Sequence, residues 1–250
     1  MKQWWVSFIA RPRIAYLRLR FAPQIAFARA RLSPGNEFGL RLTLGVLLIV
    51  GAAWLFGGVA EDVVTGDPLT EVDVQVSHWF HAHASASVTR YVLIFTHLHG
   101  TIGIVLLSAA LALYFLWRRQ RYWLLTVLIV VPCGMLLNVL LKQVFLRQRP
   151  SFDDPLLTLT SYSFPSGHVA GATLFYGVLA AFLVSSLPTW SLRVLAVLGA
   201  CLLVVLVGLT RIYLGVHYVS DVVAAAAWST AWLVLCLFAI DALRRRRRRR

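Results

Sequence analysis

The sequence predicts an all-α integral membrane protein, built as a six-helix transmembrane bundle with an N-terminal basic interfacial segment. Of the 250 residues, 59% are hydrophobic and only 14% are charged, and the mean hydropathy is +0.75. A soluble domain carries about 25% charged residues. A helix needs about 20 apolar residues to cross the hydrocarbon core of a bilayer, and six runs approach this length: 40–60, 92–117, 122–146, 168–187, 192–212 and 218–243.

The basic segment comprises residues 1–39. Its arginines are interspersed with aromatic and aliphatic residues, and Glu37 is its single acid. This composition is typical of a helix that lies in the membrane interface. An organellar transit peptide has a similar composition and stays an alternative. Pro34-Gly35-Asn36 marks the break before the first span.

Charge alternates along the spans and predicts their orientation. The segment after the first span is acidic, and within it 72–83 can form a helix on the membrane surface. Arginines crowd the turn at 118–121 and form the tail 244–250. Because basic loops stay in the cytoplasm, both termini are expected there, in the cell (inner) membrane. The single domain 40–243 would then carry its polar motifs on the periplasmic or extracellular side.

The formal net charge of +14 does not indicate a nucleic-acid partner. The excess lies in the two tails that flank the apolar spans, and no folded domain combines it with stacking aromatics. Membrane lipids are the expected partners of these arginines. The three cysteines, Cys133, Cys201 and Cys236, fall inside predicted spans without CxxC spacing. We expect buried small side chains there, and no disulfide or zinc site.

The third span ends in two cations followed by a proline. Lys142 and Arg149 are seven residues apart, so both project from one face if the helix continues past Phe145. Pro150 would then end it. The pair can hold separate oxygens of a phosphoryl group. The alternative is that both side chains only reach toward the membrane interface.

The fourth span opens with Pro165-Ser166-Gly167-His168. Its first backbone N–H groups, those of Ser166, Gly167 and His168, would face an anion at the positive end of the helix dipole. Gly167 allows the ligand to approach the backbone closely, and His168 can donate a proton to a leaving oxygen. An ordinary serine N-cap followed by a histidine is the alternative.

The start of the sixth span can order a nucleophile. His217 and Asp221 are four residues apart, so the carboxylate can accept a hydrogen bond from one ring nitrogen and leave the other free to attack. Arg211, at the end of the fifth span, adds a third positive contact. The alternative, a capped helix beside an interfacial histidine, leaves Arg211 unexplained.

Together, KQVFLRQRP (142–150), PSGH (165–168) and TRIYLGVHYVSD (210–221) resemble the three-part signature of the type 2 phosphatidic acid phosphatase superfamily. This superfamily includes membrane lipid phosphatases and soluble vanadium haloperoxidases. The resemblance spans about residues 92–243, and one departure is Thr210, where a serine is usual.

The resemblance implies the role of each residue. His217 would be the nucleophile, Asp221 its orienting partner, and His168 the acid that protonates the departing oxygen. Lys142, Arg149, Arg211, Ser166 and Gly167 would bind the phosphate. Hydrolysis would pass through a phosphohistidine and would need no metal and no cofactor. The family layout suggests undecaprenyl diphosphate, phosphatidylglycerol phosphate or phosphatidic acid as substrate, and the sequence does not choose among them.

Other functions remain open at this point. A lipid phosphotransferase would use the same phosphohistidine, and a non-catalytic anion- or lipid-binding membrane protein would need no ordered imidazole. The loop 151–164, with Leu156, Leu157 and Leu159, can close over a lipid head group, and its Asp153 and Asp154 are expected to be solvated. The remaining histidines lack metal-ligand spacing, so we expect interfacial anchoring and no metal; they are His78, His81, His83, His97 and His99.

Overall fold

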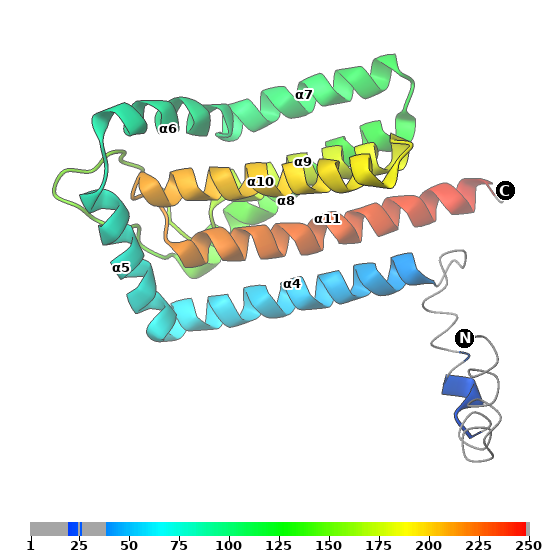
Figure 1. Cartoon of the computed structure of the whole chain (residues 1–250), viewed down its shortest axis with the longest axis horizontal. Coiled ribbons are helices and arrows are strands. Elements are labelled where there is room, and N and C mark those ends of the chain that lie inside the picture. Colours follow the sequence, from blue (N-terminus) through cyan, green and yellow to red (C-terminus); the bar gives the residue numbers. More distant parts are fainter. Residues whose placement is uncertain (1–19, 25, 27–38, 249–250) are drawn as a thin grey trace, which may run out of the picture. The chain divides into compact units, whose positions relative to one another are not determined.

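The computed structural model describes residues 20–24, 26 and 39–248, and the described part of the chain is helical without strands. The predicted interfacial helix at 1–39 falls almost entirely outside these residues. Figure 1 shows the helices in chain order. They are α4 (Leu40–Thr65), α5 (Pro68–Ala82), α6 (Ala86–Leu98), α7 (Thr101–Trp117), α8 (Arg121–Phe145), α9 (Gly167–Ser186), α10 (Trp190–Tyr213) and α11 (Val219–Arg248).

Contacts divide the chain into a unit that ends at Leu48 and a unit that begins at Ile49. The described residues of the first unit include a helical stretch near residues 20–24 and the beginning of α4. The second unit carries everything else, including the three motifs.

The predicted membrane architecture is confirmed. Five helices are long and apolar enough to cross a bilayer, namely α4, α8, α9, α10 and α11. Helices α6 and α7 meet at an angle of 49° and pass the same test together, so the number of spans is six when this bent pair is counted as one. The run 92–117 is therefore not one straight helix, as the sequence suggested. The last helix also continues past residue 243 into the arginine tail.

A histidine and a glycine hold the bend between α6 and α7. The Nδ1 atom of His99 lies 2.8 Å from the Phe95 carbonyl oxygen, and its Nε2 atom lies 2.8 Å from the Tyr176 hydroxyl of α9. A Cβ atom at Gly103 would lie 2.0 Å from the Leu98 carbonyl oxygen. Only glycine allows the two helices to meet at this angle.

Helix α9 forms the centre of the unit, because it packs against α7, α8, α10 and α11. Small residues at Ala170, Gly171 and Ala172 bring its backbone close to its neighbours, and all three are buried. Such close approach is how membrane helices associate where lipid removes the hydrophobic driving force. The first turn of α9 is thereby held in a fixed position.

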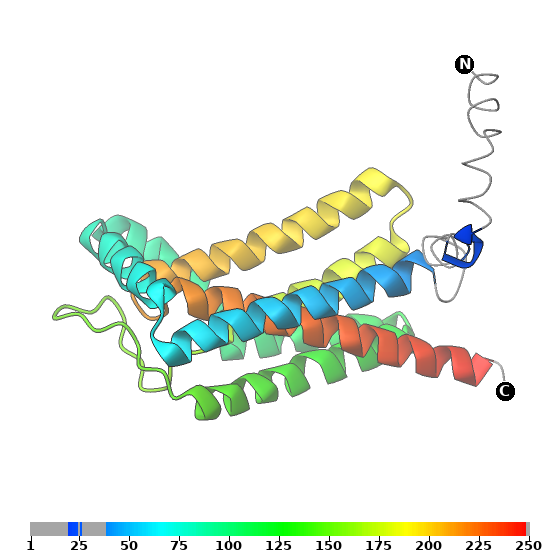
Figure 2. The same ribbon diagram turned by 90° about the horizontal axis from the view of Figure 1, so that it is seen from below.

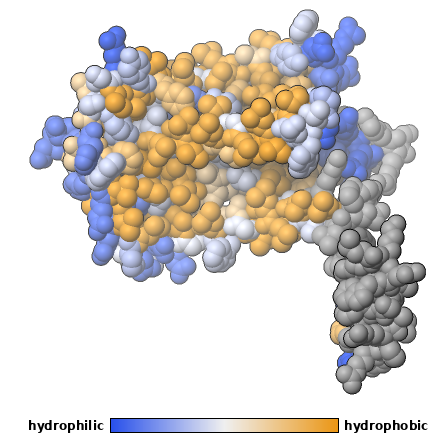
Figure 3. Space-filling model, viewed as in Figure 1, coloured by the Kyte–Doolittle hydropathy of each residue, from blue (hydrophilic) through white to orange (hydrophobic). Residues whose placement is uncertain are grey.

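The outer surface of the long helices is apolar, as lipid contact requires. Figure 3 shows hydrophobic residues along the sides of the helices and hydrophilic residues gathered at their ends. Cys133 and Cys201 are exposed on this surface, so the prediction that they are buried was wrong; Cys236 is buried as expected. All three are free thiols.

Helix α5 runs across one end of the bundle, as the two views in Figures 1 and 2 show. It packs against α10 and α11. The sequence predicted a helix over 72–83, and the structure begins it earlier, at Pro68, a residue favoured in a first turn. The loop between α8 and α9 lies at the same end.

Candidate active site

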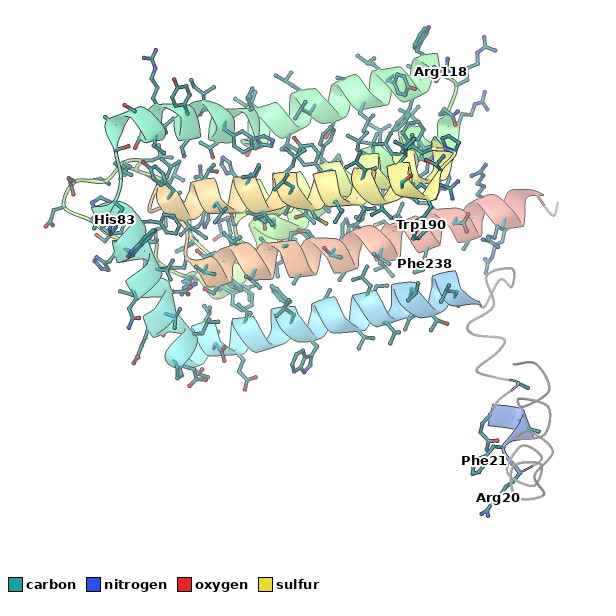
Figure 4. The ribbon with its side chains drawn as sticks, viewed as in Figure 1. Arg20, Phe21, His83, Arg118, Trp190 and Phe238 are labelled. Atoms are coloured by element: carbon teal, nitrogen blue, oxygen red, sulfur yellow. The ribbon has the colours of Figure 1, made fainter. Side chains whose placement is uncertain are left out.

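The three motifs meet at the end of the bundle that α5 crosses. Figure 4 shows His83, which follows α5, at this end, and Arg118 and Trp190 at the opposite end. The end of α8, the start of α9, the end of α10 and the start of α11 each contribute side chains. The connecting segments 146–166 and 214–218 complete the group.

The first motif does not work through helix periodicity. Helix α8 ends at Phe145, and Leu146 adopts a left-handed conformation with φ of 50°. Arg149 therefore belongs to an irregular segment, and the prediction of one continuous helix face was wrong. Lys142 donates to the carbonyl oxygens of Tyr162 and Ser163, at 3.2 Å for the latter.

Arg149 reaches the site from this segment and is held by backbone carbonyls. Its Nε donates to the Ser161 carbonyl oxygen at 2.6 Å, and its guanidinium also donates to the carbonyl oxygens of Tyr162 and Val216. One Nη atom lies 3.3 Å from Nε2 of His217. The segment 161–163 thus fixes both cations of the motif.

The second motif opens α9 as predicted, with Ser166 as its N-cap. One expectation was wrong: the backbone N–H of Ser166 is not free, because it donates to the Asp221 carbonyl oxygen at 3.1 Å. The amides of Gly167 and His168 occupy the first turn, where a helix offers no internal acceptor. The Ser166 hydroxyl and the Asn138 amide oxygen are buried without a partner among the described residues.

The third motif orders its imidazole. Nδ1 of His217 lies 3.2 Å from Oδ2 of Asp221, and both side chains are buried. A proton on Nδ1 satisfies the carboxylate and leaves the lone pair of Nε2 toward the Arg149 guanidinium. Burial lowers the pKa of His217 to about 3, although Asp221 opposes the shift. The ring is therefore neutral near pH 7.

Arg211 is buried and has one hydrogen-bond partner among the residues that the structure describes. It is 1% exposed, and one Nη donates to the Thr96 hydroxyl at 2.8 Å. Its Nε and its other Nη find no acceptor among the described residues. A buried guanidinium with free donors is costly unless an anion binds it. His168 interacts electrostatically with Arg211, His217 and Arg149, so it lies in the same group.

Sequence reasoning missed Arg147 and Asp73. Arg147 donates to Oδ1 of Asp221 at 2.7 Å and to Oδ2 of Asp73 at 2.8 Å. Asp73, from α5, is fully buried and also accepts from the backbone N–H of Ser220 at 3.0 Å and from its hydroxyl. No local motif links a carboxylate to an arginine 74 positions away.

Ser163 and Thr96 were missed as well. The Ser163 hydroxyl donates to Oδ2 of Asp221 and lies 3.5 Å from Nδ1 of His217. The backbone N–H of Tyr218 also donates to this oxygen, at 2.9 Å. Asp221 is consequently surrounded by donors, as a buried carboxylate requires.

The charges do not cancel. Among the groups counted here, the carboxylates are Asp221 and Asp73, which both pair with Arg147. The other cations of the site are Lys142, Arg149 and Arg211. Four cations therefore face two anions, which leaves two positive charges around the neutral His217. Such an excess within a partly buried site favours binding of a dianion, the charge state of a phosphate monoester near neutral pH.

The other histidines form no metal cluster. Within the described residues, no three His, Cys, Asp or Glu side chains converge to hold an ion. Nε2 of His81 lies 2.9 Å from Oδ1 of Asp154, and its ring stacks on Phe152 at 4.0 Å. Asp154 is 89% exposed, so it is solvated as predicted, but it also ties its loop to α5.

Comparison with known proteins shows the same architecture elsewhere. The chain is 30% identical to a transmembrane PAP2 type phosphatidylglycerolphosphate phosphatase from Bacillus subtilis, whose crystal structure it matches with a TM-score of 0.67. That match covers 79% of this chain and 96% of the other.

Curated relatives carry related names. The chain is 39% identical over 128 residues to Phosphatidylglycerophosphatase B of Bacillus subtilis, which covers 51% of this chain and 63% of the relative. It is 33% identical over 118 residues to an Undecaprenyl-diphosphatase of Sulfolobus acidocaldarius. That match covers 45% of this chain and 53% of the relative. The chain thus spans less than two thirds of the length of either.

The PAP2 superfamily profile matches residues 121–245, which is half of the chain and contains all three motifs. The chain therefore belongs to the PAP2 superfamily.

Proposed function

We propose that this protein hydrolyses the phosphate ester of a membrane lipid through a phosphohistidine at His217. One observation carries the proposal: a buried, neutral imidazole is fixed by Asp221 through Nδ1, while its Nε2 faces an excess of cations. Pure anion binding needs no such ordering of an imidazole.

The first step would transfer the phosphoryl group. Nε2 of His217 attacks phosphorus, the bond from phosphorus to the lipid oxygen breaks, and His168, which enters this step as the imidazolium, gives its second ring proton to that oxygen. Asp221 stabilises the positive charge that develops on the ring. In the second step water attacks phosphorus, the bond to Nε2 breaks, and His168 takes the proton from water.

The cations would stabilise the transition state. The free donors of Arg211, together with Arg149 and Lys142, can contact the equatorial oxygens, on which negative charge is spread. The unpartnered Ser166 hydroxyl and the Gly167 amide are available to the same group. A bound phosphate would thus accept hydrogen bonds from the Arg211 donors that have no acceptor among the described residues.

Three observations support a lipid as substrate. The site lies at the end of apolar spans, and the relatives are named for lipid phosphates. In addition, a groove of about 600 Å³ runs beside α6, with Leu93, Ile94 and Leu156 among its apolar lining residues. It reaches His97, an electrostatic neighbour of His168. An acyl or prenyl tail can occupy this groove while its phosphate lies at His217.

The distribution of arginines also predicts which side of the membrane the active site faces. The arginine-rich turn at 118–121 lies at the end opposite the site, and Arg244 lines a groove with this turn. Retention of basic segments in the cytoplasm would place the active site on the periplasmic or extracellular side of the cell membrane. A cysteine at Asp154, labelled by an impermeant reagent in intact cells, tests this placement.

Vanadate should inhibit the enzyme competitively, because it can adopt the five-coordinate geometry of phosphoryl transfer at His217. EDTA should leave the rate unchanged, since the proposed steps use only side chains. Phosphate release from phosphatidylglycerol phosphate and from p-nitrophenyl phosphate measures both effects. Indifference to vanadate, or preference for the soluble ester, would refute the corresponding part of the proposal.

We also propose that Asp73 is a positioning residue, which acts through Arg147 on Asp221. Asp73→Asn should lower kcat about 10-fold, the loss of roughly one charged hydrogen bond. KM should not change, because Asp73 does not reach the phosphate. Rates are expressed per vanadate-binding site, so that loss of folded protein does not count as loss of rate.

Glu71→Gln is the matched control for this experiment, because Glu71 is exposed on the same helix and carries the same charge. It should keep the wild-type rate. An Asp73→Asn protein with wild-type kcat per vanadate site would show that the α5 contact only stabilises the fold.

A further inference from the structure

A second groove lies at the end of the bundle opposite the three motifs. Its volume is about 460 Å³, and it forms between the turn that precedes α8 and the last turns of α11. Arg119, Arg121 and Arg244 line its polar part. None of the steps proposed for the active site uses this groove.

The three arginines have no acidic partner in the part of the chain that the structure describes. Within the described residues they form no ion pair with a carboxylate, and the nearby Asp241 pairs with Arg245 at 2.8 Å. The Arg244 guanidinium lies instead over the Tyr122 ring, 4.9 Å from its centroid. Arg119 adopts φ of 54°, a conformation that costs a non-glycine residue about 1 kcal/mol.

The start of α8 adds donors to the same place. Gln120 is the N-cap residue, and its side chain makes no capping hydrogen bond. The backbone N–H groups of Arg121 and Leu124 donate to the carbonyl oxygens of Arg119 and Gln120. This leaves the N–H groups of Tyr122 and Trp123, at the positive end of a 25-residue helix, without an acceptor among the described residues. Three guanidinium groups and a helix N-terminus together suit a phosphate group.

The remainder of the groove is apolar, which selects the kind of anion. Leu125 and Ile129 of α8 and Ile240 and Leu243 of α11 continue it along the lipid-facing side of the bundle. A free phosphate or a nucleotide would leave this wall unused. An anionic phospholipid would place its phosphate among the arginines and one acyl chain along the wall.

This groove is distinct from the substrate site. Arg121 and Lys142 lie near opposite ends of α8, and 21 residues of helix extend about 32 Å at 1.5 Å per residue. That length equals the hydrocarbon thickness of a bilayer, so a lipid here belongs to the other leaflet. We infer that Arg119, Arg121 and Arg244 form a binding site for one anionic phospholipid in the leaflet opposite the active site.

Native mass spectrometry of the full-length protein in detergent tests this inference. Wild type should retain phosphatidylglycerol in preference to phosphatidylcholine. The variant R119Q/R121Q/R244Q should lose at least about 10-fold in affinity for phosphatidylglycerol, since each lost charge near an anionic headgroup contributes about 1 kcal/mol. Inorganic phosphate in excess should not displace the lipid, because it cannot occupy the apolar wall.

The matched control is R118Q/R193Q/R246Q, which removes the same charge from the same end of the bundle outside the groove. It should retain phosphatidylglycerol like wild type. Equal loss in both variants would reveal a diffuse charge effect, and retention by R119Q/R121Q/R244Q would overturn the site. Wild type and both variants keep the same active site, so lipid bound there contributes equally to all three measurements. Because the measurement does not use turnover, it can fail or succeed independently of the proposed hydrolysis.

Discussion

Replacement of His217 by glutamine is expected to abolish phosphate release, with kcat lowered at least about 10⁴-fold, because the residue that would accept the phosphoryl group is gone. Glutamine is chosen because it fills much of the buried volume and can still hydrogen-bond Asp221. Phosphate release from phosphatidylglycerol phosphate is the measurement, in the purified detergent-solubilised protein.

His83→Gln is the matched control, since His83 is exposed and its hydrogen bond and ring contact are both with Trp79. Its rate and its melting temperature should equal those of wild type. The His217→Gln protein should still bind vanadate weakly through its arginines. Turnover within 10-fold of wild type, a factor equivalent to about 1.4 kcal/mol, would exclude His217 as the nucleophile.

Asp221→Asn is expected to have the second largest effect, a loss of about 10³-fold or more in kcat, because an amide no longer enforces the Nδ1–H tautomer of His217. The change also removes one of the two carboxylates that pair with Arg147, so that Asp73 is left as its charged partner among the described residues. We therefore expect reduced stability as well, by roughly 3 kcal/mol, the lower range for one partner of a buried ion pair.

Two measurements separate these effects. The midpoint of thermal unfolding in detergent reports stability, and kcat per vanadate-binding site reports the chemistry. Asp154→Asn, at an exposed aspartate, should leave both nearly unchanged. An Asp221→Asn protein that loses stability but keeps kcat would restrict Asp221 to a structural role.

Local patterns predicted the parts of this site that depend on near neighbours in the chain. Apolar runs gave the spans. The four-residue spacing gave the hydrogen bond between His217 and Asp221, although His217 lies in the connecting segment just before α11 begins at Val219. The start of the fourth span at Pro165-Ser166-Gly167 was predicted from local signals as well, and α9 begins at Gly167. Hydropathy and residue spacing along the chain are sufficient to predict such local features.

Contacts between distant segments were not predictable in this way. Arg149 does not share a helix face with Lys142, because Leu146 ends α8 in a left-handed conformation. The Asp73 carboxylate read as one more acid in an external segment, although it is fully buried against Arg147 and Ser220. Such partners are set by the packing of α5 across the bundle, which no local spacing encodes.

The bend between α6 and α7 was missed for a related reason. Hydropathy averages over a window, so a continuous apolar run reads as one helix. Gly103 was a local signal, but its meaning depends on the approach of Leu98, which only the structure reveals. The bend matters because Thr96 and His97, just before it, lie beside Arg211 and His168.

The central claim is that His217 carries the phosphoryl group during turnover. Rapid quenching with ³²P-labelled lipid phosphate, followed by peptide mapping, tests it most directly. Label that is stable to alkali and labile to acid should appear on the peptide containing His217, and it should be absent from the His217→Gln protein. Turnover without such label on wild type at any quench time, or label elsewhere in the chain, would contradict the account.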